Sequence, residues 1–311
     1  MPARRTPIRV IDGELPWPDT AGHGGEGSAV GGRGGEPAGV PGSASIDVTV
    51  AHPPRRYDYW LGGKDNFQAD RDSADTVAAA WPAIRTAVLE NRGFLRRAVG
   101  FLAGTVGVRQ FLDIGTGLPT ASNVHQVAQG IAPESRIVYV DNDPLVLVHA
   151  RALLTSSPEG ATAYIDADLR TPEKIIQDVG VRDTLDFSQP IALMLLAVLH
   201  FLSDADDPYA VVTRLMDALP AGSYLVLSHS TFDPLDEETA AKLAVVGAKS
   251  VPPFIARSRE EVARFFSGLE LLEPGIVSVA DWRAEHEPRP RPAPADVAWY
   301  GAVARKPVQR A

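Results

Sequence analysis

Two short runs of the sequence combine glycines and acids in a pattern that can hold a nucleoside. The apolar segment 110–114 carries Asp113 and is followed at once by Gly115 and Gly117, and a second apolar segment ends in Asp141. Glycines let the backbone turn tightly and approach a ligand, and an acid at the tip of the next strand can accept both hydroxyls of a ribose. The pattern predicts a site for an adenosine-bearing cofactor. A tight strand-to-helix turn without a ligand is the alternative.

The glycines do not complete the fingerprint of nicotinamide dinucleotide enzymes. That fingerprint requires a third glycine three positions after the second and an acid about 20 residues further on. Thr120 takes the third position here, Pro119 precedes it, and Asp141 lies farther along the chain than the fingerprint asks. A cationic sulfonium cofactor with an amino-acid tail fits better, because its ammonium group would meet Asp113. A nicotinamide oxidoreductase is therefore the less favoured reading.

Composition excludes several other classes of protein. The 311 residues include no Cys and carry a net charge of −9. Disulfides, thiolate metal sites and cysteine nucleophiles are thereby excluded, and the seven His show no metal-ligand spacing, so we predict no metal. An acidic chain is a poor partner for nucleic acid, and no apolar stretch approaches the roughly 20 residues of a membrane span. We expect a cytoplasmic protein that binds neither nucleic acid nor membrane.

The chain divides into three regions. Residues 1–45 are rich in Gly and lack a periodic apolar pattern, which predicts a disordered tail. Residues 46–107 show helical spacing over 55–61, 70–80 and 82–103, and we interpret them as a helical lid region. Residues 108–311 are predicted to form the cofactor-binding domain.

Strands and helices alternate through most of the third region. Nearly continuous apolar runs at 110–114, 136–141, 161–165, 190–196 and 222–229 are typical of buried parallel strands, and helical segments separate them. A capping box at Ser258 and Glu261 opens a further helix, after which segments 269–279 and 297–304 read as strands without a helix between them. The pattern predicts an α/β, doubly wound, Rossmann-like sheet that closes with an antiparallel C-terminal hairpin.

Residues 45–306 resemble an actinobacterial family of S-adenosylmethionine-dependent methyltransferase-like proteins whose substrate is unassigned. The first matching block runs from Arg56 to Phe67, and its part from Tyr57 through Gly62 and Gly63 to Phe67 is the most specific. The other matching blocks are Asn91-Arg92-x-Phe94-Leu95-Arg96-Arg97-Ala98-Val99, Phe111 to Thr120, Asn123-Val124-His125, Val138 to Pro144, Asp166 to Arg170, Ala197 to Phe201, Ser228-His229 and Tyr300-Gly301. The resemblance implies the seven-stranded methyltransferase sheet, a helical N-terminal addition over the cofactor mouth, and S-adenosylmethionine as the cofactor.

The resemblance also implies cofactor contacts, position by position. They are Asp113, Gly115 and Gly117 around the methionine portion, with Thr116 between the glycines, Asp141 at the ribose, Asn142, Asp168 and Leu169 at the adenine, and Ala197 and Val198 at the exit of the fourth strand. These roles are general to methyltransferases, so they leave the acceptor undefined.

Residues 196–200 favour a small acceptor, because they lack the Asn or Asp, prolines and aromatic found there in amino-methylating nucleic-acid enzymes. A base is needed only if the acceptor must lose a proton. His200 is the leading candidate because imidazole titrates near neutrality, although a packed histidine is the alternative. Tyr59 is a second catalytic candidate.

The polar and aromatic residues just before the sheet form a second candidate group. We expect Tyr57, Tyr59, Lys64, Asp65 and Asn66 to form a lid and acceptor wall. The alternative is a capped helix end packed on the core.

The favoured function is a small-molecule methyltransferase. A protein that binds S-adenosylmethionine for regulation without turnover is the alternative, because a fold alone does not fix function. The two differ in whether demethylated cofactor accumulates. The sequence leaves the acceptor atom and the oligomeric state open.

Overall fold

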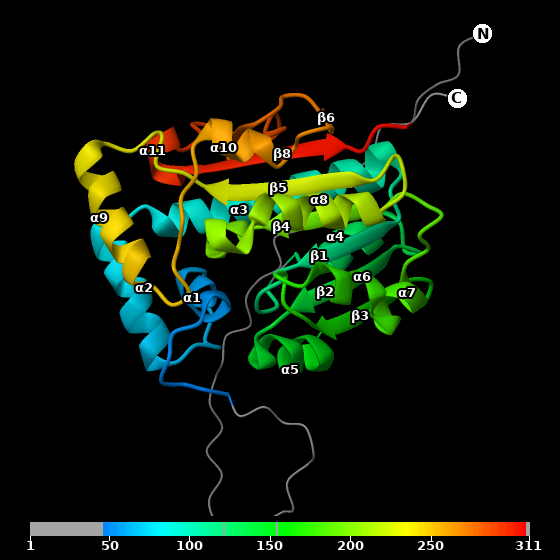
Figure 1. Cartoon of the computed structure of the whole chain (residues 1–311), viewed down its shortest axis with the longest axis horizontal. Helices are drawn as coiled ribbons and strands as arrows, with labels where there is room; N and C mark the ends of the chain where they lie inside the picture. Colours follow the sequence, from blue (N-terminus) through cyan, green and yellow to red (C-terminus); the bar gives the residue numbers. More distant parts are fainter. Residues whose placement is uncertain (1–45, 121, 154, 309–311) are drawn as a thin grey trace, which may run out of the picture. The chain divides into compact units, whose positions relative to one another are not determined.

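A mixed β-sheet with helices on both faces forms the centre of the computed structural model (Figure 1). The structure describes residues 46–308 except Ala121 and Leu154. The predicted tail over residues 1–45 lies outside the described residues. None of the helices in the described part of the chain is long and apolar enough to cross a membrane.

The sheet has the strand order β3-β2-β1-β4-β5-β8-β6, with β7 also paired to β8. The strands are β1 (Gln110–Ile114), β2 (Arg136–Asp141), β3 (Ala161–Asp166), β4 (Ala192–Leu196), β5 (Tyr224–Ser230), β6 (Glu270–Leu271), β7 (Val277–Ser278) and β8 (Trp299–Arg305). The first five strands run parallel, whereas β8 runs antiparallel to β5 and pairs with β6 and β7 along its other edge. Because β6 and β7 pair with different parts of the same edge of β8, the eight strands occupy seven places side by side, as predicted for a seven-stranded sheet. The sheet closes with antiparallel strands.

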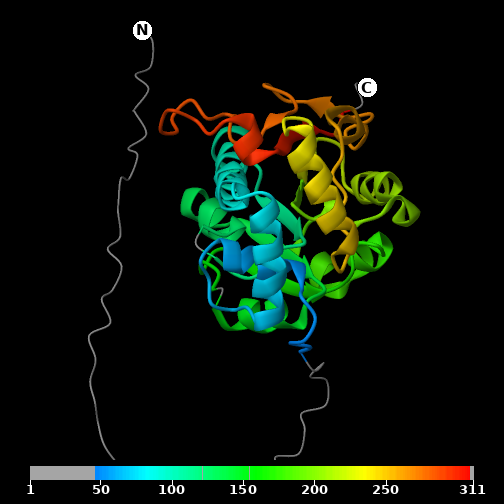
Figure 2. The same cartoon turned by 90° about the vertical axis from the view of Figure 1, so that its left-hand side faces the viewer.

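Helices connect the strands and extend the N-terminus. They are α1 (Pro53–Trp60), α2 (Gln68–Ala80), α3 (Ile84–Phe101), η1 (Leu102–Val106), α4 (Val124–Ile131), α5 (Pro144–Leu153), α6 (Pro172–Gln177), α7 (Val179–Thr184), η2 (Leu199–Phe201), η3 (Asp204–Asp206), α8 (Pro208–Ala218), α9 (Glu237–Lys249), α10 (Arg259–Arg264) and α11 (Pro294–Val297). Helices α2 and α9 lie side by side although they are far apart in sequence (Figures 1 and 2).

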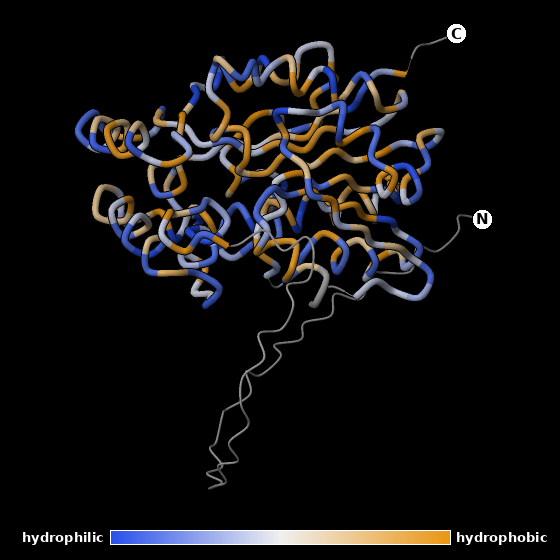
Figure 3. Tube along the Cα trace, turned by 60° about the horizontal axis from the view of Figure 1, so that its bottom comes forward, coloured by the Kyte–Doolittle hydropathy of each residue, from blue (hydrophilic) through white to orange (hydrophobic). Residues whose placement is uncertain are grey.

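The central strands β1, β2, β4 and β5 bury side chains on both faces of the sheet, because successive residues of a strand point to opposite sides. Phe111 packs into a core with residues of α3 and α4, whereas Leu112 packs into a second core with α6, α7 and α8. Figure 3 shows these central strands as predominantly hydrophobic. Burial on both faces explains why the strands read as continuous apolar runs.

Three of the differences from the sequence-based prediction concern the glycine turn, the closing strands and the cavity wall. The helix after the glycines begins at Val124 rather than near residue 120, because Asn123 and Gln126 form a capping box there. The strand predicted over 269–279 is split into β6 and β7, because Pro274 lacks a backbone N–H and Gly275 turns with φ 81°. Helix α9 was not predicted at all.

The strand order reverses between β1 and β4, which are neighbours in the sheet. Ligands of open α/β sheets bind outside the carboxyl ends of the strands at such a reversal. The fold therefore predicts that the ligand site is formed by the loops that follow β1, β2, β3 and β4.

Candidate active site

A cavity of about 420 Å³ lies at the carboxyl ends of the parallel strands. The loops after β1, β2, β3 and β4 and Arg92 of α3 line one end, and side chains of α1, α2 and α9 with other residues of α3 line the other. We call these the nucleoside end and the acceptor end.

The glycine turn forms part of the nucleoside end. Gly115 has φ 75°, and a Cβ there would lie 2.5 Å from Cγ2 of Val198. Gly117 has φ 69°, but a Cβ there would meet no atom within 4 Å. Packing therefore requires glycine at Gly115, whereas Gly117 opens a space that a ligand can approach.

Two buried carboxylates stand beside this turn. Asp141 accepts hydrogen bonds from the N–H groups of Gly117 (2.8 Å) and Asp143 (3.0 Å), and burial raises its pKa. Burial also raises the pKa of Asp113 to about 7; Arg92 opposes that rise, and the charge of Asp141 adds to it. Both carboxylates line the cavity, where a cation or a diol would stabilise their ionised forms.

The N-terminal region is tied to the strand end by a buried ion pair. Arg55 donates from Nε and Nη2 to the two carboxylate oxygens of Asp143, each at 2.9 Å, and His52 Nδ1 lies 3.1 Å from Oδ2. Burial opposes ionisation, but His52 and Arg55 outweigh it and hold the pKa of Asp143 well below its usual range. Asp143 also accepts from the N–H of Leu145 at the start of α5. This contact anchors α1 against the nucleoside end.

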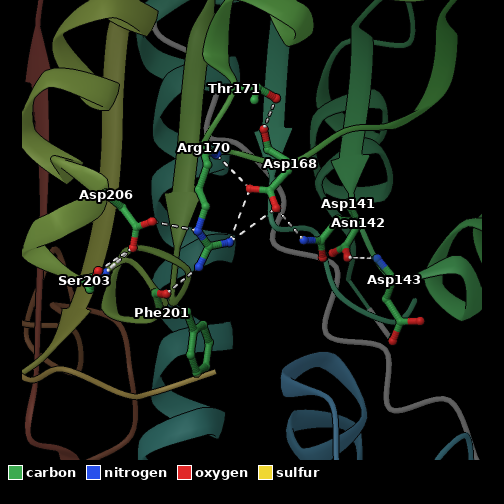
Figure 4. A network of polar contacts seen from close by, with 9 residues as sticks. All are labelled: Asp141, Asn142, Asp143, Asp168, Arg170, Thr171, Phe201, Ser203 and Asp206. Carbon is green, nitrogen blue, oxygen red and sulfur yellow. Dashed lines mark hydrogen bonds and ion pairs between the residues drawn. The ribbon is translucent and has the colours of Figure 1, made fainter. Parts of the chain in front are cut away.

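A polar network joins the loops after β2, β3 and β4 (Figure 4). Asn142 donates to Asp168 at 3.2 Å, and Arg170 lies 3.3 Å from the same carboxylate. Arg170 also bonds Asp206 (3.1 Å) and the carbonyl oxygen of Phe201 (3.1 Å). Leu169 is buried on the predicted adenine side of the cavity. The network connects that side to the segment around Phe201, which leads to the acceptor end.

The exit of β4 has an unusual backbone. Ala197 adopts φ 54°, a left-handed conformation rare for a residue other than glycine. Its N–H donates to Oγ (3.0 Å) and to the carbonyl oxygen (3.2 Å) of Ser228 on β5. The next residue, Val198, packs on Gly115. The chain is therefore held at the point where it passes between the two ends of the cavity.

His200 lies in the wall of the acceptor end. Its ring is buried, 4.4 Å from the ring of Phe201, 4.8 Å from Phe254 and 5.8 Å from Trp299, measured between centroids. Its Nδ1 has no hydrogen-bond partner among the described residues. Burial lowers the pKa of His200 well below its usual range, and the nearby His229 and cationic arginines lower it further. His200 is therefore neutral at pH 7, and its unpaired Nδ1 keeps its hydrogen-bonding capacity.

A buried arginine fixes the segment that carries His200. Arg257 donates to the carbonyl oxygens of Leu199 (3.2 Å) and Leu202 (3.1 Å), and it pairs with Asp204 at 3.0 Å. It also contacts Nε2 of His229 at 3.0 Å. His229 thus has a structural position behind the cavity.

Tyr59 does not line the cavity, contrary to its prediction as a catalytic residue. Its hydroxyl donates to Asp75 on α2 at 3.1 Å. Arg56, Tyr57 and Trp60 of the same helix do line the cavity. Two residues span about 200° of a helix, so Tyr57 and Tyr59 must face opposite sides. The Tyr57 hydroxyl is itself bonded to the carbonyl oxygen of Val88 and accepts from Asn91, and burial raises its pKa to about 12.

Lys64, Asp65 and Asn66 also lie outside the cavity wall, so the predicted acceptor wall does not include them. Asp58 folds this segment back, because its Oδ2 accepts from the Asp65 N–H (3.0 Å) and from Asn66 Nδ2 (2.8 Å). A Cβ on Gly63 would lie 1.9 Å from the Asp58 carboxylate. The segment is the capped helix end that we considered as the alternative.

Three arginines line the cavity without a role assigned from the sequence: Arg56, Arg92 and Arg170, of which Arg170 belongs to the polar network described above. Arg92 donates to the carbonyl oxygen of Ser122 at 3.0 Å and acts electrostatically on Asp113. Arg56 shares a helix face with Tyr57 and Trp60. All three stand in blocks that carry the family resemblance, and that resemblance was the signal that could have identified them.

The chain matches a family described as S-adenosyl methyltransferase over residues 40–307. It is 46% identical to a DUF574 family protein from Streptomyces avermitilis, with a TM-score of 0.79 over 85% of this chain and 100% of that one. It is 42% identical to a proposed methyltransferase from Thermobifida fusca, with a TM-score of 0.77 over 85% of this chain and 97% of that one. No curated protein matches the chain.

Proposed function

Because this chain belongs to the S-adenosyl methyltransferase family and uses S-adenosylmethionine, we propose that it methylates a small molecule inside the cavity. The observation that carries the proposal is the continuity of the cavity from the glycine turn to a wall of aromatic residues around His200. A small molecule can enter such a space, which is lined on the acceptor side by α1, α2 and α9, more readily than a polymer can.

The residues at the nucleoside end fit the cofactor. Gly117 leaves open space at the turn, and the carboxylates of Asp113 and Asp141 suit an ammonium group and a ribose diol. We assign Asn142, Asp168 and Leu169 to the adenine, with Thr116, Ala197 and Val198 in the surrounding wall. Bound there, S-adenosylmethionine supplies an electrophilic methyl group on a sulfonium.

The protein's own contribution is positioning and exclusion of water, which can supply much of the catalysis of a displacement. We assign His200 to the acceptor. Its neutral imidazole can accept a hydrogen bond from an O–H or N–H at Nδ1, and it takes the proton when that group is methylated. The depressed pKa keeps the ring unprotonated at neutral pH but makes it a weak base.

Formation of S-adenosylhomocysteine in cell extract tests the function. The protein and S-adenosylmethionine are incubated with an extract divided by ultrafiltration into metabolites and macromolecules, and the product is measured by mass spectrometry. We expect product with the metabolite fraction and loss of most of it in His200→Ala. Product with macromolecules alone would contradict a small acceptor, and binding without product in either fraction would favour a regulatory protein.

Gly117→Ala is expected to weaken S-adenosylhomocysteine binding at least tenfold, because the added Cβ enters the space at the turn. Gly107→Ala is the matched control, since Gly107 also has positive φ (89°) with open space but lies outside the cavity. Both variants should lose about 1–2 kcal/mol of unfolding free energy from the left-handed backbone. Calorimetry and urea unfolding separate the two effects, and equal affinities in the two variants would count against the cofactor site.

Binding of S-adenosylhomocysteine should weaken as the pH falls below 7. Asp113 has a pKa of about 7 in the free protein, so roughly nine tenths is ionised at pH 8 and roughly one tenth at pH 6. A cationic ammonium group requires the ionised form, so we expect up to about tenfold loss of affinity over that range. Adenosine, which lacks the amino-acid tail, should not show this loss, and Asp113→Asn should flatten the profile. A pH-independent Kd in the native protein would refute the assignment of Asp113.

A further inference from the structure

Arg56 is a buried cation in the cavity wall. The residue is 3% exposed, its Nη1 donates to Ser73 Oγ at 3.3 Å, and its Nε has no partner among the described residues. Asp70 is the acid that acts on it, but the Asp70 carboxylate already accepts from the N–H groups of His52 and Phe67, each at 2.8 Å. In the described part of the chain, no carboxylate forms an ion pair with Arg56. A buried charge without an ion-pair partner is costly unless a ligand supplies the anion.

The position of Arg56 assigns it to the acceptor rather than to the cofactor. Its guanidinium lies 5.9 Å from the ring centre of Phe201, and its charge acts on His200. Arg92, by contrast, acts on Asp113 at the nucleoside end, where the amino-acid tail of the cofactor is expected. An anion bound by Arg56 would therefore stand beside His200.

The surroundings of Arg56 are aromatic. Trp60, Phe254 and Trp299 line the cavity with it, and they offer flat apolar surfaces. Ser230 also lines the cavity, and its buried Oγ has no partner among the described residues. The acceptor end thus places the Arg56 cation among neutral hydrogen-bonding groups that include His200 and Ser230, in an apolar aromatic setting.

We propose that Arg56 binds an anionic group of the methyl acceptor, and that the acceptor is a flat, mainly apolar acid such as an aromatic carboxylate. The proposal rests on the proposed function, because it concerns the acceptor end of the same cavity. A planar guanidinium pairs with a carboxylate through two parallel hydrogen bonds, and aromatic walls hold a planar body by stacking. Recognition of a neutral analogue would leave the buried cation unpaired.

Calorimetric titration with naphthalene-2-carboxylate and its neutral analogue 2-naphthamide tests the proposal. In the full-length protein saturated with S-adenosylhomocysteine, we expect the carboxylate to bind at least tenfold more tightly than the amide. Arg56→Met should remove this preference and leave the affinity for S-adenosylhomocysteine unchanged. Arg85→Met, an exposed arginine outside the cavity, should retain the preference. Equal binding of the two probes to the native protein, or a preference that survives in Arg56→Met, would overturn the proposal.

Unfolding experiments separate ligand binding from a structural role. If Arg56 serves a ligand, its replacement by an apolar side chain of similar length leaves the urea midpoint unchanged or raises it, because an unpaired buried charge is removed. A clearly lower midpoint would indicate a structural role and overturn the proposal. Failure of S-adenosylhomocysteine to bind the native protein would instead contradict the proposed function, and the two probes can then be compared in protein without it.

Discussion

Asp141→Ala will bind S-adenosylhomocysteine about 100-fold more weakly than the native protein. The variant loses the proposed acceptor of both ribose hydroxyls, and hydrogen bonds to an ionised group contribute about 1.5–3 kcal/mol each. It also loses the group that accepts from the Gly117 N–H at 2.8 Å, so the turn becomes less defined before the cofactor arrives. Calorimetric titration measures the difference directly.

Asp166→Ala is the matched control for this measurement. Asp166 ends β3 in register with Asp141 at the end of β2, but it is exposed and does not line the cavity. Its replacement should leave the affinity unchanged. A folded Asp141→Ala protein with less than a threefold change in Kd would show that the ribose is held elsewhere.

Arg55→Ala will lower the free energy of unfolding by about 3–5 kcal/mol. The substitution removes both donors of the bidentate pair at 2.9 Å and leaves the buried Asp143 carboxylate with a partly exposed His52. Removing one partner of a buried ion pair carries a cost of this size, because the remaining charge stays buried. The loss is a large part of the total stability of a typical domain. Urea unfolding monitored by circular dichroism reports it.

Arg305→Ala provides the comparison for Arg55→Ala. Arg305 pairs with Glu270 at 2.6 Å, but their side chains are 42% and 50% exposed. Exposed pairs contribute about 0–1 kcal/mol, so this variant should unfold at nearly the native midpoint. If both variants lost the same small amount, the contact between α1 and the strand end would not be the anchor that we infer.

The nucleoside end of the cavity could be predicted from the sequence, because the residues predicted for it lie at or just after the ends of strands that the sequence also predicts. Asp113, Gly115 and Asp141 each follow an apolar strand, and the carboxyl ends of parallel strands meet at one edge of the sheet. The order of strands and helices along the chain therefore brought these groups together without knowledge of any side-chain packing. The fold class and the antiparallel closing strands followed from the same alternation of apolar runs.

The acceptor end could not be read in this way. Tyr59 and Lys64 have side chains suited to chemistry, but the phase of α1 and the turn around Asp58 direct them away from the cavity. Helix α9, which lines that end, has few buried residues of its own and gave no clear pattern.

The sequence by itself determined the sheet, the cofactor and the residues at the strand ends. Only the tertiary structure decided which face of α1 meets the cavity, that His200 is buried and neutral, and that Arg56 has no counter-ion among the described residues. The physical reason is that the succession of strands and helices along the chain, and the glycine turns, depend on neighbours in sequence. Burial and charge pairing depend on groups that are distant in the chain and meet only when it has folded.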